Sequence, residues 1–347
     1  MGNKNGKQGG KLRVGVIGAG MISGSHLEAY KKDARVETVW VADVVKEKAV
    51  ARANEYGVPK AVADYASVLK EVDAVSVCTP PFAHLKPVLD AARAGVHVLC
   101  EKPMSLASAE SRQMVDACAK AKVKLGIASS RSTLKSDVQA ARDLVAKGKL
   151  GKVYYSRATT LRRRGRPGLD FWPDVTWFLD SKKAGGGSIM DIGCYDIDIL
   201  LTILGEPQPV SVSAISAREI GSQRVPKGVI HDTDEHMSYF VRFKNGSAAH
   251  FETSWAANMD GGDTVIFGTE GGIRLNPLTF FGETNGTTHD AKLNIGKWSQ
   301  SPQEDFVSAC VGKKAEPDTP GTMGLKVTQI IEAALKSAKE GKEIRID

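Results

Sequence analysis

The sequence has 347 residues, of which 42% are hydrophobic and 25% are charged, and its formal net charge is +7. A chain of this length makes about two domains, and its composition excludes a disordered tail protein, a collagen-like fibre and a disulfide-rich scaffold. No run of residues approaches the ~18 consecutive apolar positions of a membrane span, so we expect no membrane partner.

Residues 1–11 are basic and rich in glycine, and we expect them to form a disordered tail. No binding motif accompanies this charge, and the rest of the chain is close to balanced, so we expect no nucleic-acid partner. The tail lacks the apolar segment of a secretion signal, and the five cysteines are scattered without a C-x-x-C pair. Both features favour a cytoplasmic protein without a disulfide framework or a zinc site.

Short apolar runs alternate with helix-length segments over the first 130 residues. Continuous β-branched runs separated by helices are typical of a parallel sheet that is covered on both faces. We therefore predict a doubly wound Rossmann domain of the α/β class over residues 12–130. Its predicted strands are residues 12–17, 36–42, 74–79, 96–100 and 123–128.

The second half of the chain has longer strands with alternating polarity, which predict a mostly antiparallel sheet with helices on one face. We assign residues 131–347 to this α+β domain and expect its last helix to pack back on the body. Asn245-Gly246 is the turn signal of one hairpin. The other expected elements are a helix over 134–147, a strand over 151–161, a Gly-rich loop and helix over 185–205, a hairpin over 262–277 and the last helix over 321–340.

A dinucleotide fingerprint follows the first predicted strand. Gly18 allows a tight turn, Gly20 lets the backbone approach a diphosphate, and Ser23 replaces the third glycine of the motif. The helix that begins here, with Met21 and Ile22 in its first turn, offers unpaired N–H groups to phosphates. This loop predicts a nucleotide cofactor.

The choice of cofactor depends on the end of the second predicted strand. Asp43 lies there, about 20 residues beyond the glycines, where a carboxylate accepts hydrogen bonds from the ribose hydroxyls and repels a 2′-phosphate. NAD is therefore favoured over NADP. Lys46 and Lys48 lie close to Asp43 and keep NADP as the alternative.

Several further segments resemble the Gfo/Idh/MocA oxidoreductase family. They are Thr79-Pro80-Pro81, His84, AGVHVLCEKP over 94–103 and GGGSIMDIGCYDID over 185–198. The resemblance spans nearly the whole chain. It implies an N-terminal Rossmann domain, a C-terminal domain built on a large open sheet, and oxidoreductase activity with a nicotinamide cofactor.

The resemblance also assigns roles to the Glu-Lys-Pro segment. It implies that Thr79, Pro80 and His84 lie on the cofactor side, that Glu101 lies near the nicotinamide ribose, and that Lys102 reaches the reacting hydroxyl. An ammonium group there stabilises a developing alkoxide or carries its proton. The bond between Lys102 and Pro103 is expected to be cis, as it often is in relatives.

Asp191 and Tyr195 form the predicted second half of the site, because residues four apart on a helix share one face. Relatives commonly carry Asp and His at these two positions, so Tyr195 departs from the family pattern. A tyrosine with an ordinary pKa near ~10 needs help to act as a base, and Lys102 would lower that pKa. We predict that Lys102 and Tyr195 transfer the proton while Asp191 orients the substrate or Lys102.

Residues 161–178 carry four arginines in five positions, followed by two tryptophans. The family resemblance places this segment beside the substrate, where Trp172 would stack on a sugar ring and Arg163 would bind hydroxyls or an anionic group. Arg131 is a further candidate substrate contact. The alternative is a solvated basic loop or a subunit contact.

His26, His84 and the run HDTDEH contain histidines to which we assign no catalytic role. We expect His26 and His84 to be structural or close to the cofactor. The acidic run HDTDEH over 231–236 enters a predicted strand, where neighbours point to opposite faces, so we expect no metal there.

The favoured function is an NAD(P)-dependent oxidoreductase that acts on a secondary alcohol of a sugar, polyol or glycoside. The chain would work as a homodimer or homotetramer, because the exposed face of a large sheet commonly needs a partner. Three alternatives stay open: a glycosidase-type enzyme that recycles its NAD, a glucose-fructose-type oxidoreductase with tightly bound NADP, and a sugar-sensing regulator without catalysis.

Overall fold

The computed structural model describes residues 10–220, 225–284, 287–296 and 299–346. The chain divides into two compact units, the first made of residues 1–105, 109–131 and 300–325, and the second made of residues 106–108, 132–299 and 326–347. Residues 300–325 thus group with the first unit, whereas the sequence assigns them to the second domain. Most of the predicted basic tail lies outside the described residues, and the predicted domain boundaries stay predictions.

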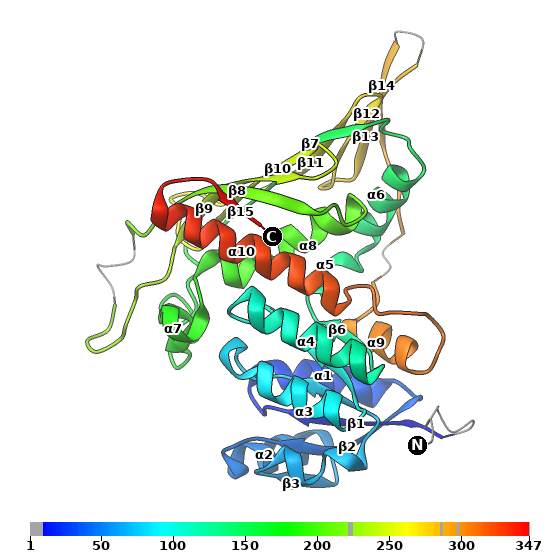
Figure 1. Ribbon diagram of the computed structural model, residues 1–347, viewed down its shortest axis with the longest axis vertical. Coiled ribbons are helices and arrows are strands. Elements are labelled where there is room, and N and C mark those ends of the chain that lie inside the picture. The colour runs from blue at the N-terminus through cyan, green and yellow to red at the C-terminus, as the bar shows by residue number, and fades with distance from the viewer. Residues whose placement is uncertain (1–9, 221–224, 285–286, 297–298, 347) are drawn as a thin grey trace. The chain divides into compact units, whose positions relative to one another are not determined.

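The first unit is built on a parallel sheet (Figure 1). In the part of the chain that the structure describes, six strands follow the order β3-β2-β1-β4-β5-β6, and each pairing is parallel. This confirms the doubly wound fold and the five predicted strands, to which the structure adds the short β3. The strands are β1 (Leu12–Ile17), β2 (Val36–Ala42), β3 (Lys60–Val62), β4 (Ala74–Val77), β5 (His97–Cys100) and β6 (Leu125–Ile127).

Both faces of this sheet are buried, as the continuous apolar runs predict. Trp40, Val75 and Val77 belong to one buried cluster, while Val14 and Val16 belong to another. Each cluster is closed by helices whose apolar side chains pack on the strands. The helical segments along this part of the chain are α1 (Met21–Lys32), α2 (Lys46–Tyr56), η1 (Tyr65–Ser67), η2 (Leu69–Glu71), η3 (Pro81–Ala83), α3 (Leu85–Arg93), α4 (Ser108–Ala121), α5 (Ser130–Thr133) and α9 (Pro302–Cys310).

The second unit contains a larger sheet. Across the described ranges its nine strands follow the order β14-β13-β12-β11-β7-β10-β9-β8-β15. Strands β7 and β10 pair in parallel and the remaining neighbours are antiparallel, so the predicted mostly antiparallel sheet is confirmed. The strands are β7 (Val153–Leu161), β8 (Pro209–Ala217), β9 (His236–Phe243), β10 (Ala248–Ser254), β11 (Thr264–Gly268), β12 (Gly271–Arg274), β13 (Thr279–Thr284), β14 (Thr287–Lys292) and β15 (Ile344–Arg345).

Both predicted hairpins are present, because β9 pairs with β10 and β11 pairs with β12. Gly246 turns the first hairpin with a φ of +84°, a conformation that glycine adopts without strain. The last helix begins and ends where the sequence predicts. The helical segments of this part of the chain are α6 (Ser136–Ala146), η4 (Thr176–Leu179), α7 (Ser181–Ala184), the π-helix η5 (Ile189–Gly193), α8 (Cys194–Ile203) and α10 (Gly321–Glu340).

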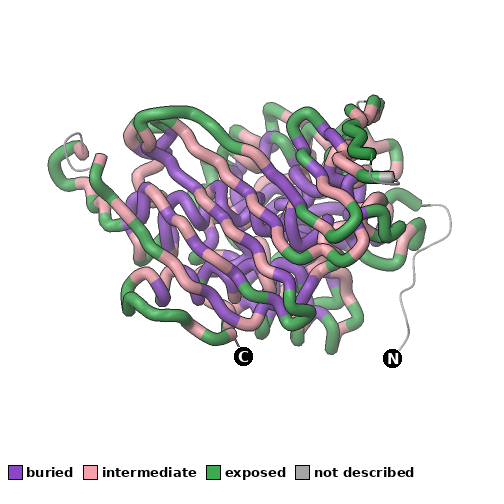
Figure 2. Tube along the Cα trace, turned by 90° about the horizontal axis from the view of Figure 1, so that it is seen from above, coloured by how far each residue is buried: buried purple, intermediate pink, exposed green. Residues whose placement is uncertain are grey.

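The two faces of the larger sheet differ in burial. Along β9, Met237, Tyr239 and Val241 are buried, while Ser238 and Phe240 between them are half-buried. Figure 2 shows this alternation along the strands. The sheet therefore packs its helices on one face and leaves the other face open. Among the described helices, none combines the length and the apolar character that crossing a membrane requires.

Candidate active site

The predicted cofactor residues of the first unit gather at one edge of its sheet. The carboxyl ends of parallel neighbours meet at the same edge, and β2, β1, β4 and β5 are neighbours in that order. Each of the four strand ends contributes. Gly18, Gly20, Met21 and Ile22 follow β1, Asp43 follows β2, Thr79, Pro80 and His84 follow β4, and Glu101 and Lys102 follow β5.

The glycine loop after β1 leaves space for an anion. Gly18 has a φ of +96°, and a Cβ added there would lie 2.8 Å from the carbonyl carbon of Cys78. A Cβ at Gly20 would meet no described atom within 4 Å. Gly20 is the N-cap of α1, whose first turn has neither a side-chain cap nor an acidic residue. The N–H groups at this helix start therefore fit a diphosphate.

Asp43 is held in place by the backbone around it. Its carboxylate accepts hydrogen bonds from the N–H of Ala19 at 2.8 Å and from the N–H of Val45 at 2.9 Å. A carboxylate has about four acceptor positions, so two bonds leave capacity for hydroxyl donors. The contact with Ala19 also links the glycine loop to the end of β2. This geometry suits the ribose of a dinucleotide.

The Glu-Lys-Pro segment follows β5, and the Lys102–Pro103 peptide bond is cis, as expected. Glu101 is buried, with its side chain 5% exposed. Its Oε1 accepts a hydrogen bond from His26 Nε2 at 2.8 Å and pairs with the guanidinium of Arg131. Its Oε2 accepts the N–H of Lys102 at 3.1 Å. Protein groups thus occupy both oxygens of Glu101.

A chain of buried side chains continues behind Glu101. His26 Nδ1 lies 2.9 Å from Ser76 Oγ, and the Tyr30 hydroxyl lies 2.6 Å from the same oxygen. Burial raises the pKa of Glu101, but the charge of Arg131 and the hydrogen bond from His26 outweigh it, so the pKa lies well below its usual range. Glu101 is therefore an anion. Since a carboxylate only accepts, His26 Nε2 donates to it.

His84 contacts the backbone rather than other side chains. Its Nε2 lies 2.7 Å from the carbonyl oxygen of Thr79, and its Nδ1 lies 3.1 Å from that of Met104. Burial lowers the pKa of His84, while the contacts with these two carbonyl oxygens raise it. The ring ties the loop after β4 to the segment after the cis proline.

In the second unit, Asp191 and Tyr195 occupy the same side of the η5–α8 segment. Both are half-buried, whereas residues 192–194 and 196–198 are buried. The predicted helix near residue 189 is present, and it begins as a π-helix, a form often found at functional sites. Asp191 Oδ2 accepts the indole N–H of Trp255 at 3.0 Å and lies 3.7 Å from an Arg162 nitrogen.

The turn before η5 is fixed by Asp234, which lies in the acidic run HDTDEH. Its carboxylate accepts the N–H of Gly187 at 2.6 Å, the hydroxyl of Ser188 at 2.7 Å and the N–H of Ile189 at 3.1 Å. This carboxylate is therefore a cap for the segment that carries Asp191. Within the described ranges, no group of three or more metal-ligating side chains is placed to hold a metal ion.

Asp196 is a buried carboxyl group that the sequence analysis did not single out. Its Oδ1 accepts the hydroxyl of Thr160 at 3.0 Å, and its Oδ2 has no hydrogen-bond partner among the described residues. Burial raises the pKa of Asp196 to about 7, although the Thr160 hydrogen bond and the charge of Arg162 lower it. The group thus titrates near neutral pH beside the candidate site.

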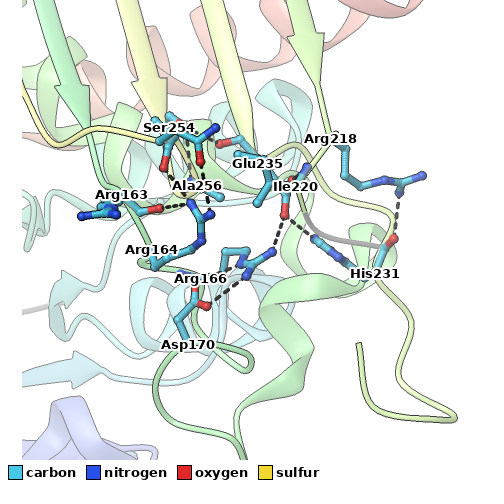
Figure 3. Close-up of polar contacts among 12 residues, drawn as sticks. Arg163, Arg164, Arg166, Asp170, Arg218, Ile220, His231, Glu235, Ser254 and Ala256 are labelled. Atoms are coloured by element: carbon cyan, nitrogen blue, oxygen red, sulfur yellow. Dashed lines mark hydrogen bonds and ion pairs between the residues drawn. The ribbon is translucent and has the colours of Figure 1, made fainter. Parts of the chain in front are cut away.

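In the arginine-rich loop, Arg164 and Arg166 contact other groups of the protein (Figure 3). Arg166 is 1% exposed; its Nε lies 2.9 Å from Asp170, and its Nη1 lies 2.9 Å from Glu235. His231 lies 3.8 Å from the same Glu235 carboxylate. Arg164 donates to the carbonyl oxygen of Ala257 at 2.7 Å. Arg166 is therefore a buried structural group, which separates it from the solvent-facing arginines of the loop.

Trp172 is the exposed aromatic residue of this loop. Its side chain is 49% exposed, and its backbone has a φ of +51°, which is uncommon for a large side chain. The Phe171 ring lies 4.7 Å from it, edge to face. Residues held in such conformations cluster at ligand sites. The neighbouring Trp177 instead stacks on Phe178 at 3.8 Å.

The predicted site residues fall into two groups. Lys102, Arg131 and the cofactor residues belong to the first unit, while Asp191, Tyr195, Arg163 and Trp172 belong to the second. The pairing of Lys102 with Tyr195 stays a prediction. Sequence reasoning missed the contact of Trp255 with Asp191 and the titration of Asp196. The acidic run and the arginine-rich run showed that charged side chains are present. They did not show which residue each charged side chain contacts.

Comparison with known proteins gives matches along the whole chain. Residues 12–129 match a family described as an oxidoreductase family with an NAD-binding Rossmann fold, and residues 138–274 match a GFO/IDH/MocA C-terminal domain. A D-glucoside 3-dehydrogenase of Escherichia coli (strain K12) is 30% identical, over 96% of this chain and 97% of that protein. An inositol 2-dehydrogenase of Rhizobium meliloti (strain 1021) is 27% identical, over 96% and 99%.

Solved structures share the fold. An oxidoreductase domain protein from Kribbella flavida has a TM-score of 0.84 at 24% identity, covering 97% of this chain and 100% of that one. A levoglucosan dehydrogenase in complex with NADH has a TM-score of 0.81 at 22% identity, covering 97% and 99%.

Proposed function

The chain belongs to the Gfo/Idh/MocA family of NAD-binding oxidoreductases, and on this basis we propose that it oxidises a secondary alcohol of a sugar, polyol or glycoside with NAD. The proposal is supported by the arrangement of residues at the carboxyl ends of the parallel strands. There the uncapped start of α1, the pinned carboxylate of Asp43 and the Glu-Lys-Pro segment lie at neighbouring strand ends. This arrangement supports a cofactor site, at whose reactive end Lys102 would present its ammonium group.

The residues present fit a nicotinamide dinucleotide. Gly18 and Gly20 would hold the diphosphate through backbone N–H groups, and Asp43 would accept the hydroxyls of the adenosine ribose. Because a carboxylate repels a 2′-phosphate, we propose NAD rather than NADP. When bound, the nicotinamide supplies the two-electron hydride acceptor.

Lys102, Tyr195 and Asp191 would manage the hydroxyl proton. Oxidation breaks a C–H bond and an O–H bond, so the hydride leaves carbon and the proton leaves oxygen. We assign the proton to the Lys102–Tyr195 pair, since an ammonium group next to a phenol makes the phenolate accessible near neutral pH. Asp191, fixed by Trp255 and Arg162, would orient the substrate or Lys102.

For the substrate we propose a pyranoside oxidised at carbon 3. The support is the D-glucoside 3-dehydrogenase relative, which matches 97% of its own length. Trp172 offers an exposed ring for stacking on a sugar face, and Arg163 offers a donor for its hydroxyls. Lys102, Asp191 and Tyr195 complete the proposed substrate contacts.

We also propose that the protein is a cytoplasmic homo-oligomer. Tyr155, Arg157 and His250 line a shallow cavity of about 510 Å³ on the open face of the larger sheet. The open face of a sheet with nine described strands is suited to binding a second copy of the chain, because most soluble oligomers are symmetric homo-oligomers.

The first experiment mixes the purified protein with NAD or NADP and a panel of free sugars, polyols, uronates and glycosides. Reduced nicotinamide is followed by its absorbance. We expect a rise with NAD and a glycoside, and a smaller or no rise with NADP. Silence across the whole panel would count against net oxidation. Product analysis by mass spectrometry would then test for a recycled cofactor.

The role of Tyr195 is tested by Tyr195→Phe, which removes one hydroxyl and keeps the ring. We expect kcat to fall by roughly 10²-fold or more, the usual loss for an acid–base group, with little change in NADH binding. Turnover near that of the parent enzyme would remove Tyr195 from the mechanism.

A further inference from the structure

The structure gives Arg131 a partner within the protein, whereas the sequence suggested a substrate contact, which stays a prediction. Its guanidinium pairs with Glu101, and its Nε donates to the carbonyl oxygen of Ala128 at 2.9 Å. The Arg131 side chain is 31% exposed, whereas that of Glu101 is 5% exposed. The pair therefore joins a partly exposed cation to a buried anion.

The Glu101 carboxylate lies next to the backbone of Lys102, the proposed catalytic lysine. Glu101 precedes Lys102 in the chain, and its second oxygen accepts the N–H of Lys102 at 3.1 Å. The carboxylate thus bonds to Arg131 on one oxygen and to the Lys102 backbone on the other. The charges of Glu101 and Lys102 also interact, because the charge of Lys102 lowers the pKa of Glu101.

Among the neighbouring charges that lower the pKa of Glu101, that of Arg131 has the largest effect, ahead of His26 and Lys102. Burial raises the pKa of the Cys78 and Cys100 thiols, so these thiols are neutral near pH 7, and burial lowers the pKa of His84. His26 donates to Glu101 from Nε2 and lies next to Ser76 through Nδ1. The surrounding titratable groups are His26 on α1, Cys78 after β4, His84 before α3, Cys100 on β5, Lys102, and Arg131 on α5.

We propose that Arg131 is a positioning residue for Lys102, which it controls by neutralising and holding Glu101. An uncompensated anion beside an amine keeps the amine protonated, because the charged pair attracts. With Arg131 in place, the anion is already paired, and the proposed Lys102–Tyr195 pair can release its proton at a lower pH. The inference rests on the proposed function, in which Lys102 shares the proton transfer.

Four variants separate this role from a substrate contact. Arg131→Met removes the guanidinium charge beside Glu101 and leaves the His26 hydrogen bond, and Arg131→Lys keeps the charge. Glu101→Gln alone removes the anion and leaves Arg131, while the double variant Glu101→Gln/Arg131→Met removes both charges. The control is Arg13→Met, because Arg13 also pairs with a carboxylate, that of Asp73 at 2.7 and 3.1 Å, at the amino end of the same sheet.

The first readout is the pH profile of kcat for alcohol oxidation at saturating NAD. We expect the midpoint of the activity rise to move up by about one pH unit in Arg131→Met and to move down in Glu101→Gln. In Arg131→Lys and in the double variant this midpoint should lie close to that of the parent. In Arg13→Met it should be unchanged. The opposite result is a raised substrate KM in Arg131→Met with an unchanged midpoint, and a KM that stays raised in the double variant. It would show that Arg131 binds substrate and would overturn the proposal.

The second readout needs no turnover. Lys102 is labelled with an amine-reactive anhydride across a pH series, and its peptide is quantified by mass spectrometry. The labelling midpoint of Lys102 should follow the same order among the variants. If no alcohol is oxidised but the midpoints shift, the proposed function fails and the Arg131 inference stands. If oxidation occurs but the midpoints stay together, the inference is wrong. Should Arg131→Met not fold, the opposite shift in Glu101→Gln still decides the matter.

Discussion

Three carboxylates near the candidate site share a chemical group but differ in surroundings. Glu101 is an anion because Arg131 and His26 offset its burial. Asp191 is half-buried and held by the indole of Trp255 at 3.0 Å. Asp196 is buried with one oxygen unpartnered among the described residues, and burial raises its pKa to about 7. For Glu101 and Asp196, the environment rather than the residue type sets the charge.

Asp196 gives a prediction about stability and pH. Its pKa is raised from 3.8 to about 7, so the folded state holds the proton more tightly than the unfolded chain does. Stability therefore falls as the pH rises between these two values. Asp196→Asn abolishes that titration. At pH 8 the variant should be more stable than the parent by up to about 4 kcal/mol, at about 1.4 kcal/mol per pKa unit.

Urea unfolding at three pH values from about 4 to 8 measures this effect. The difference between Asp196→Asn and the parent should be small at the acidic end and grow with pH. Asp174→Asn, at an exposed position of the same unit, is the control and should show no such growth. A difference that is the same at every pH would contradict the buried titration.

At the scale of elements, the turn before η5 positions the second half of the candidate site. Gly187 lies against Asp234 so closely that an added Cβ would be 1.9 Å from the Asp234 carbonyl oxygen. The same residue donates its N–H to the Asp234 carboxylate at 2.6 Å. The backbone of residues 187–189 is thus fitted to one partner, and it leads directly into the segment that carries Asp191.

Gly187→Ala should therefore disturb both stability and activity. The new methyl group meets backbone, which cannot move aside as a side chain can, so we expect a loss of at least about 2 kcal/mol. kcat should fall because Asp191 shifts with the turn. Gly261→Ala is the matched control, since an added Cβ there meets no described atom within 4 Å. Equal stability of the two variants in urea would refute this account of the turn.

At the scale of the whole molecule, the open face of the larger sheet is the surface that we assign to a second copy. Light scattering should give a mass of two or four chains for the parent. Thr159→Arg places a long charged side chain in the cavity of that face and should shift the mass toward one chain. Ala66→Arg, at an exposed position of the first unit, should leave the mass unchanged. A monomeric parent protein would end the proposal.

The order of elements is encoded locally, which is why the sequence predicts so much of the fold. The strand over 12–17 and the helix over 321–340 match the structure in both bounds. Asn245-Gly246 marks its hairpin, and the glycines after β1 mark the cofactor loop. These signals depend on periodicity and turn chemistry over a few residues. The short β3 and the π-helix escaped prediction because neither has a pattern of its own.

The partners of the functional side chains are not encoded locally. Glu101 meets His26 across 75 positions, and Trp255 meets Asp191 across 64. The residue types announce charges and donors, but a contact forms only when packing brings two distant segments together. The same holds for Asp196, because its raised pKa comes from burial, and burial belongs to the assembled core. Short-range pattern therefore identified the family, the cofactor loop and the candidate residues, while long-range packing assigned each charge its partner and its state of protonation.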